Sequence, residues 1–224
     1  MKNPLRSGAG FVLVFVRAVA PAFVCAVALG AASGTTPLDQ YFDGLTTLRA
    51  SFTQTVKDAH GKEVDHTTGT LVVSRPGKFR WEVHPKAASG GAGQLLVADG
   101  RNVWFFDRDL EQVTVKPVDT ALSSTPAMLL SGASDLRENF KLTPAGARDG
   151  LDWVLVEPKR TQADFRRALF GFTKGNLQRM IIDDRLGQTA TIEFDSVKRN
   201  EPVAPDEVSF VPPKGTDVIG TPAS

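Results

Sequence analysis

The sequence predicts a mainly β protein with a few short helices, in which one antiparallel sheet is strongly curved or closed into a barrel. Three observations support this prediction. About ten or eleven short apolar runs follow one another at the spacing of a β-meander, turn-forming residues separate them, and no helical segment is long enough for a crossover between parallel strands. Several runs are apolar on both faces, which indicates that a second layer covers the sheet.

The first 32 residues have a composition of their own and precede the predicted fold. They contain three basic residues and no acidic one, and residues 18–29, which follow the last basic residue, are all apolar or small. A positive start, a short apolar stretch and a small-residue exit predict a secretory signal peptide. We expect cleavage after Ala28, Gly30 or Ala32, of which Ala32 is favoured. The stretch is shorter than the roughly 20 residues of a membrane span, which favours cleavage over a retained membrane anchor. The remaining residues, 33–224, have the length of a single domain.

Cys25, the only cysteine, lies inside this leader. The bulky Val24 directly before it fits the recognition sequence of a lipid-modified cysteine poorly, so we expect a mature chain without disulfide or lipid of its own. Loss of the three basic residues of the leader changes the formal net charge from +1 to about −2. This charge argues against a nucleic-acid partner, which requires a basic excess.

The first mature element is predicted to be a helix over residues 36–48. Thr36 is a suitable N-cap, Pro37 suits the first turn, and Asp39 completes a capping-box-like pattern. Large apolar residues then recur at helical spacing and form one stripe of Leu38, Tyr41, Phe42, Leu45 and Leu48. From about Arg49 the pattern changes to period two, which indicates the first strand.

Turn chemistry separates the strand-like runs that follow. The Pro-Gly pair at 76–77 and the Asp-Gly pairs at 99–100 and 149–150 are strong turn signals. The last run, residues 207–212, is expected to be the final strand. Arg75 stands directly before the first of these turns. An arginine at a turn is usually solvated, so spacing alone gives this side chain no role.

One apolar segment, residues 117–140, interrupts the series of strands. Thr125 and Pro126 precede the residues AMLL, and the following Ser-Gly ends the pattern, which predicts a short capped helix. The residues SDLRE after it predict another helical turn. Together with residues 36–48, these segments are available to cover the second face of the sheet. The space beneath them is either a filled core or an apolar cavity, and the pattern does not distinguish the two.

No catalytic or metal-binding pattern stands out in the sequence. The three histidines, His60, His66 and His84, lack the spacing of a metal site, and there is neither a G-x-S-x-G motif nor a phosphate loop. The sequence therefore predicts neither an enzyme nor a bound cofactor or metal. An apolar interior without acid–base groups would bind lipid or acyl chains.

Several longer strings resemble the LolA family, the periplasmic carriers of outer-membrane lipoproteins in Gram-negative bacteria. They follow one another over nearly all of the mature chain: SFTQ at 51–54, RPGKFRW at 75–81, LLVADGRNVWFFDRDLEQVTV at 95–115, TPAMLLSG at 125–132, DDRLGQTATIEF at 183–194 and F-x-PPKGTDV at 210–218. The resemblance implies an unclosed antiparallel β-barrel of about eleven strands with a helical lid over an apolar cavity.

The resemblance also implies a function without catalysis. A carrier of this family is a monomer of the periplasm that takes acylated lipoproteins from an inner-membrane lipoprotein-releasing ABC transporter. It shields their acyl chains from water and delivers them to a receptor at the outer membrane. No cofactor and no nucleic acid takes part.

The family's site residues transfer to this sequence position by position. Its lid latch is an arginine in the Arg-Pro turn, which here is Arg75, and in the family this side chain hydrogen-bonds to the lid backbone and holds the empty form closed. The residues that the resemblance implies for the acyl-chain cavity and the lid are Phe52, Phe79, Trp81, Leu95, Leu96, Trp104, Phe106, Met128, Leu129 and Leu130.

Three other functions compete with the carrier. The outer-membrane receptor of the same pathway shares the fold, but it is a lipoprotein, and the residues before Cys25 fit acylation poorly. A periplasmic domain that senses lipid or lipoprotein would usually carry a membrane span or a second domain. A lipid hydrolase would require a nucleophile and a base, for which the sequence offers no pattern.

Overall fold

The computed structural model describes residues 34–85, 91–118, 126–132, 136–160 and 165–223. The predicted leader, residues 1–32, and the predicted helix cap Thr125 lie outside the described residues. Within the described ranges, no helix is long and apolar enough to cross a membrane.

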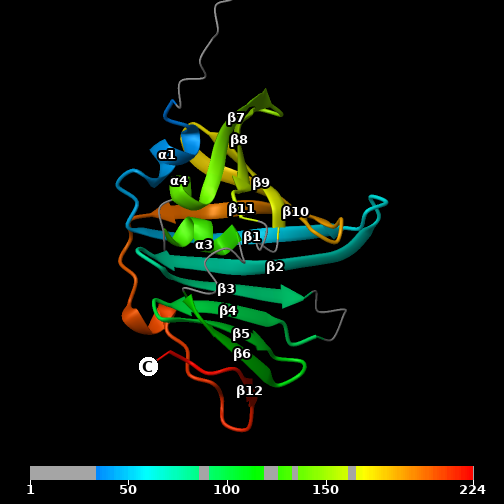
Figure 1. Ribbon diagram of the computed structural model, residues 1–224, viewed down its shortest axis with the longest axis vertical. Coiled ribbons are helices and arrows are strands. Elements are labelled where there is room, and N and C mark those ends of the chain that lie inside the picture. The colour runs from blue at the N-terminus through cyan, green and yellow to red at the C-terminus, as the bar shows by residue number, and fades with distance from the viewer. Residues whose placement is uncertain (1–33, 86–90, 119–125, 133–135, 161–164, 224) are drawn as a thin grey trace, which may run out of the picture. The chain divides into compact units, whose positions relative to one another are not determined.

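One sheet of twelve strands organises the described part of the chain (Figure 1). Its spatial order is β12-β6-β5-β4-β3-β2-β1-β11-β10-β9-β8-β7, and β7 and β12 are its two edges, so the sheet is not closed. All neighbouring strands pair antiparallel except β12, which pairs parallel to β6. The prediction of a mainly β, unclosed antiparallel architecture is confirmed.

The strands have the following bounds: β1 Thr47–Lys57, β2 Glu63–Ser74, β3 Lys78–Pro85, β4 Gln94–Asp99, β5 Asn102–Asp107, β6 Gln112–Pro117, β7 Phe140–Arg148, β8 Leu151–Pro158, β9 Phe165–Thr173, β10 Asn176–Asp184, β11 Thr189–Arg199 and β12 Asp217–Ile219. The predicted turns at 76–77, 99–100 and 149–150 each join two consecutive strands.

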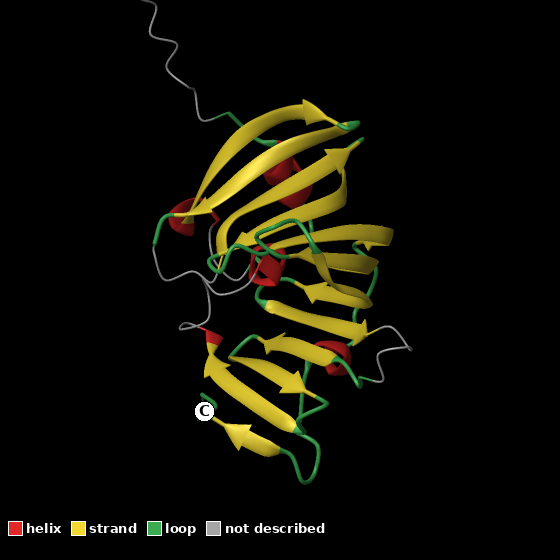
Figure 2. Ribbon diagram, turned by 90° about the vertical axis from the view of Figure 1, so that its right-hand side faces the viewer, coloured by secondary structure: helices red, strands yellow, loops and turns green. Residues whose placement is uncertain are grey.

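Four short helices of the described ranges pack on the sheet. They are α1 Pro37–Phe42, α3 Pro126–Ser131, α4 Leu136–Asn139 and the 3-10 helix η2 Pro205–Val208. α1 packs against β8, α3 against β2 and β3, and α4 against β7, whereas η2 packs against β2, β3 and β4. Figure 1 shows α3 and α4 in front of the sheet, and Figure 2 shows η2 on the other side of the strands.

Two separate apolar clusters are present among the described residues, one on each face of the sheet. The larger one includes the side chains of α1 and α3, whereas the smaller one includes Leu95 and Val97 of β4 and packs against Phe210. Successive side chains of a strand point to opposite faces. In β4, Leu96 and Ala98 therefore face the helices, and Leu95 and Val97 face the C-terminal residues.

The first helix is shorter than predicted. It ends at Phe42, because Gly44 adopts a positive φ of 63° that turns the chain out of the helix. Leu45 and Leu48 are buried as expected, at 5% and 1% exposure, but they extend from the loop and from β1. The apolar stripe is therefore real, although two of its five residues lie outside the helix.

The prediction of a last strand over residues 207–212 is wrong. Residues 205–208 form η2, and the chain around Phe210 is extended without sheet pairing. Pro205 favours a first helical turn, and the pair Pro212-Pro213 removes backbone donors that a strand ladder requires. The final strand, β12, lies further along the chain.

Candidate functional site

The floor of the interior beneath the helices is aromatic. The rings of Phe52 and Trp81 have centroids 4.5 Å apart, and the ring of Phe194 meets Trp81 edge-on at 6.4 Å. Gly69 makes this arrangement possible, because a Cβ atom at that position would lie 2.3 Å from Cζ of Phe52. Strands β1, β3 and β11 thus present one continuous apolar surface toward α3.

Helix α3 fills the space above this floor. Met128, Leu129 and Leu130 are exposed by only 4%, 2% and 0% and belong to the same cluster as Phe52 and Trp81. Among the described residues, these three side chains therefore occupy the space directly above the aromatic floor. The filling side chains belong to a helix of six residues that packs on β2 and β3.

Arg75 reaches from the turn between β2 and β3 to the end of α1. Its Nη1 donates hydrogen bonds to the carbonyl oxygens of Phe42 at 3.1 Å and Leu45 at 3.5 Å, and its guanidinium lies over the Phe42 ring, 4.7 Å from the centroid. Burial lowers the pKa of Arg75, but a guanidinium remains charged at neutral pH. The side chain is therefore not a freely solvated turn residue.

The same turn also contacts the end of α3. The backbone N–H of Gly77 donates to the carbonyl oxygen of Ser131 at 2.9 Å. Gly132, which has a φ of 63°, lies against the guanidinium so closely that a Cβ atom there would be 2.3 Å from Nε of Arg75. One turn of the sheet thus holds both helices through backbone groups and one cation.

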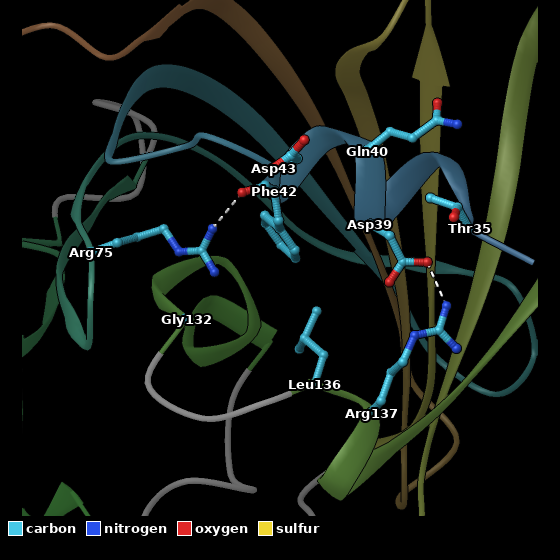
Figure 3. Close-up of a pocket in the computed structure, with 9 residues that line it drawn as sticks. All are labelled: Thr35, Asp39, Gln40, Phe42, Asp43, Arg75, Gly132, Leu136 and Arg137. Carbon is cyan, nitrogen blue, oxygen red and sulfur yellow. Dashed lines mark hydrogen bonds and ion pairs between the residues drawn. The ribbon is translucent and has the colours of Figure 1, made fainter.

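A pocket of about 670 Å³ opens beside this arginine (Figure 3). On its far side, Nη2 of Arg137 in α4 lies 2.6 Å from Oδ2 of Asp39 in α1. The wall is mixed in polarity, with two arginines and two aspartates among apolar groups. Its lining residues are Thr35, Asp39, Gln40, Phe42, Asp43, Arg75, Gly132, Leu136 and Arg137.

Helix α1 is fastened to the sheet by an arginine of β11. Nη2 of Arg199 donates to the carbonyl oxygen of Tyr41 at 2.7 Å, and its guanidinium lies 4.6 Å from the centroid of the Tyr41 ring. Burial raises the pKa of the Tyr41 hydroxyl to about 12, so this ring remains neutral at physiological pH. Its centroid lies 5.4 Å from that of Phe172, which fixes α1 against the core.

The structure brings seven of the ten predicted cavity and lid residues together. Phe52, Phe79, Trp81, Met128, Leu129 and Leu130 are buried in the cluster beneath the helices, and Leu96 packs against it.

The other three residues, Leu95, Trp104 and Phe106, lie in or against the cluster on the opposite face. They share this face because the pairing of β4 with β5 places Leu95 opposite Phe106 and Val97 opposite Trp104.

Sequence reasoning missed three contributors to the site. The helical spacing places Phe42 in an apolar stripe, but this residue also supplies a carbonyl oxygen and a ring to Arg75. Gly132 appears in the sequence only as a helix stop, and Arg137 has no role there. The Ser-Gly after the apolar helix was the available signal for Gly132. Glycine is common at a helix end, and because it has no Cβ atom, another side chain can approach its backbone closely.

The described residues contain no group of three or more histidine, cysteine, aspartate or glutamate side chains that could hold a metal ion. The described site consists of an apolar interior, the helix α3 that packs into it, and polar contacts at its rim.

Comparison with known proteins identifies relatives over most of the chain. The sequence model of the family described as outer membrane lipoprotein carrier protein LolA matches residues 43–211. The outer-membrane lipoprotein carrier protein of Methylobacillus flagellatus is 39% identical over 189 residues, which cover 84% of this chain and 90% of that protein. The protein of the same name from Nitrosospira multiformis is 40% identical over 189 residues, with 84% and 89% covered.

A solved structure shares the fold alone. An uncharacterized conserved protein from Thermus thermophilus is similar at a TM-score of 0.51 and 14% identity, over 82% of this chain and 96% of that chain. The sequence match over residues 43–211 includes the Arg75 turn, α3 and the aromatic floor. The chain belongs to the LolA family of outer membrane lipoprotein carrier proteins.

Proposed function

We propose that this protein carries acylated lipoproteins through the periplasm. It accepts them from an inner-membrane lipoprotein-releasing ABC transporter, shields their acyl chains in the interior beneath the helices, and delivers them to a receptor at the outer membrane. The names of the curated relatives support this function. It is a function of binding and release, in which the protein catalyses no reaction and uses no cofactor.

The observation that carries the proposal is the construction of α3. Three successive apolar side chains, residues 128–130, fill the interior. A longer helix or a second sheet would usually cover an apolar core of this kind, but α3 has only six residues. We infer that α3 is a lid whose side chains occupy the place of acyl chains and leave it when cargo enters.

Exchange of lid side chains for acyl chains is energetically balanced. Each buried methylene of an acyl chain contributes about 0.8 kcal/mol, and opening of α3 loses a similar contribution for each of its own buried groups. Net binding is then moderate, which suits a carrier, because transfer to the next protein depends on a difference of affinities. An interior that was empty at rest would lack this balance.

Arg75 is proposed as the latch of this lid. Its bonds end on carbonyl oxygens of Phe42 and Leu45, and Gly132 of the lid lies against it. A guanidinium presents several donors in a rigid fork, so one side chain can hold more than one segment. These contacts are not part of the sheet, so they can break without unfolding it.

The seven clustered residues Phe52, Phe79, Trp81, Leu96, Met128, Leu129 and Leu130 are proposed as the acyl-chain cavity and lid. Leu95, Trp104 and Phe106 are proposed to support the sheet from the other face, since the strand alternation directs them away from the helices. Residues 1–32 are proposed to be a signal peptide that directs the remaining single domain, residues 33–224, to the periplasm.

The function is tested by release of cargo from membranes. The purified mature chain is mixed with vesicles that contain the cognate transporter and a triacylated lipoprotein, and the supernatant is separated by size. We expect a soluble one-to-one complex. A lipoprotein with its acylated cysteine replaced is the control and should give no complex. If the acylated cargo gives none either, the carrier function is wrong.

The receptor function is tested separately by mass spectrometry of the mature N-terminus. Cleavage after Ala32 is expected for the carrier. An acylated Cys25 at the N-terminus would instead identify a membrane-anchored receptor.

A further inference from the structure

A second contact joins the proposed lid region to α1, on the side of the pocket opposite Arg75. Nη2 of Arg137 lies 2.6 Å from Oδ2 of Asp39 (Figure 3). Arg137 belongs to α4, which follows α3 in the sequence, and Asp39 belongs to the first turn of α1. Both arginines line the same pocket, so α1 is held from two directions around one opening.

The Asp39 carboxylate is positioned before Arg137 reaches it. The same Oδ2 atom accepts hydrogen bonds from the backbone N–H of Thr36 at 2.6 Å and from its hydroxyl at 2.7 Å. Burial raises the pKa of Asp39, but the hydrogen bonds from Thr36 and Arg137 outweigh this effect and lower the pKa overall. The carboxylate is therefore charged at neutral pH, and its side chain loses little further freedom when the ion pair forms.

We propose that Asp39 and Arg137 are lid-positioning residues that form a second fastening, independent of Arg75, between α4 and α1. The inference rests on the proposed function, because it treats α3 and α4 as parts of a lid. It extends that function by adding an ion pair between α4 and α1 to the contacts that the end of α3 makes with the Arg75 turn. α1 itself is fixed to β11 through Arg199 and Tyr41, so the ion pair ties α4 to a helix that the sheet holds in place.

The two fastenings differ in their chemistry. Arg75 donates to neutral carbonyl oxygens and is partly buried, so dissolved ions have little effect on it. Arg137 and Asp39 carry opposite full charges, with side chains exposed by 42% and 24%. Ionic strength weakens such a pair. Salt is therefore expected to loosen α4 while the Arg75 contact remains.

The proposal is tested by a distance measurement across the pocket. Spin labels are attached to cysteines that replace Gln40 of α1 and Glu138 of α4, both exposed, in the full chain carrying Cys25→Ser. Pulsed electron paramagnetic resonance gives the distance distribution at low salt and at about 1 M salt, where the Debye length is about 3 Å. We expect one narrow short distance at low salt and a larger long-distance population at high salt.

Substitution of the arginine isolates the contribution of the ion pair. Arg137→Gln should raise the long-distance population about fivefold at low salt, which is the effect that an exposed ion pair of good geometry supports, and should remove the response to salt. Arg137→Lys, which keeps the positive charge, should restore part of the population with the short distance. Lys141→Gln removes a neighbouring exposed ion pair with Glu157 and should change nothing.

Two results would overturn the proposal. One is a distance distribution of Arg137→Gln that equals the wild type at both salt concentrations. The other is an equal change in Lys141→Gln, which would show that the effect belongs to surface charge in general. No cargo is present in the experiment, so its failure is distinct from a failure of the carrier function.

Discussion

The two faces of the sheet are covered by segments that are attached in different ways. On one face, polar contacts hold α3 and α4 at their ends: the Gly77–Ser131 hydrogen bond, the contact of Gly132 with Arg75, and the Asp39–Arg137 ion pair. Lys159 also donates to the carbonyl oxygens of Arg137 and Asn139, where α4 runs into β7. On the other face, the C-terminal segment, residues 205–223, is attached at several points along its length to β1, β5 and β6.

The attachment of the C-terminal segment combines several kinds of contact. Arg49 forms two hydrogen bonds with the carboxylate of Glu207 at 2.6 and 2.7 Å, and the ring of Phe210 packs 5.8 Å from both Trp104 and Phe106. β12 adds a strand to the sheet, and the buried Asn102 accepts from and donates to the Ala223 backbone.

The comparison teaches that burial of apolar side chains does not by itself determine whether a cover is permanent. Both covers bury leucine-sized or aromatic groups almost completely. They differ in the distribution of their polar contacts and in their pairing with the sheet. We infer that the helical cover opens as a unit while the C-terminal cover stays in place, and the following predictions test this difference.

The largest effect on stability is expected on the C-terminal face. Trp104→Ala removes a ring that is 8% exposed, together with the hydrogen bond from its Nε1 to Asp99 at 2.7 Å. We expect the free energy of unfolding to fall by about 3–5 kcal/mol, measured by urea denaturation. Leu110→Ala, at a residue 69% exposed, is the control. A loss below about 1 kcal/mol for Trp104→Ala would show that this cover is also loose.

A smaller loss is expected from a buried leucine of the helical cover. Leu130→Ala should lower the free energy of unfolding by about 1–2 kcal/mol, less than the usual 2–5 kcal/mol for a core leucine, because α3 can open locally without unfolding the sheet. Leu71→Ala is the matched control, since Leu71 is equally buried in the same cluster but lies on β2. Equal losses for the two variants would place α3 in the cooperative core.

Arg75→Leu is expected to leave the fold intact and to impair transfer of cargo. The stability loss should be about 1 kcal/mol, since relief from burying a cation offsets part of the lost hydrogen bonds. Without the latch, the closed empty form is no longer favoured, so release of lipoprotein to the receptor should stall. Arg75→Lys keeps the positive charge but lacks the planar guanidinium with its several donors, so this variant should transfer lipoprotein at an intermediate rate. Equal transfer rates for Arg75→Leu and wild type would contradict the latch.

The smallest effect concerns the Arg49–Glu207 pair. Hydrogen bonds from Arg49 and from the Ala204 backbone lower the pKa of Glu207 to about 2. A carboxylate with a lowered folded pKa contributes stability that is complete above its unfolded pKa of about 4.5 and is lost as the pH falls through about 2. The stability difference between wild type and Glu207→Gln should therefore be constant above about pH 5 and shrink below it. A difference that stays constant down to about pH 2 would contradict this attachment.

Much of the fold could be predicted from the sequence because its signals are local. Turn residues, the period-two runs and the Ser-Gly after the apolar helix each depend on neighbouring residues only. Such local patterns predict helix α3 and the helical turn after it, and the structure confirms both. The capping box at Thr36 and Asp39 is likewise present.

The remaining features depend on which face a side chain occupies and on contacts between distant segments. A run that is apolar on both faces, such as 102–106, gives no sign of which residues face the helices, so the sequence did not separate Trp104 and Phe106 from the residues beneath α3. The Arg75 contacts join residues about 30 positions apart. Only the family resemblance, and no spacing rule, gave this arginine a role in advance.

The central claim, that the helical cover opens while the C-terminal cover stays closed, is tested most directly by exchange of two backbone amides. The Gly77 N–H donates to the carbonyl oxygen of Ser131 in α3. The N–H of Asp217, the first residue of β12, donates to the carbonyl oxygen of Glu111, which directly precedes β6. Nuclear magnetic resonance should show faster hydrogen exchange at Gly77 than at Asp217 in the wild type. Arg75→Leu should increase the hydrogen-exchange rate of the Gly77 amide about fivefold further, corresponding to about 1 kcal/mol. The exchange rate of the Asp217 amide should not change. Equal protection of both amides, unchanged by the substitution, would contradict the account.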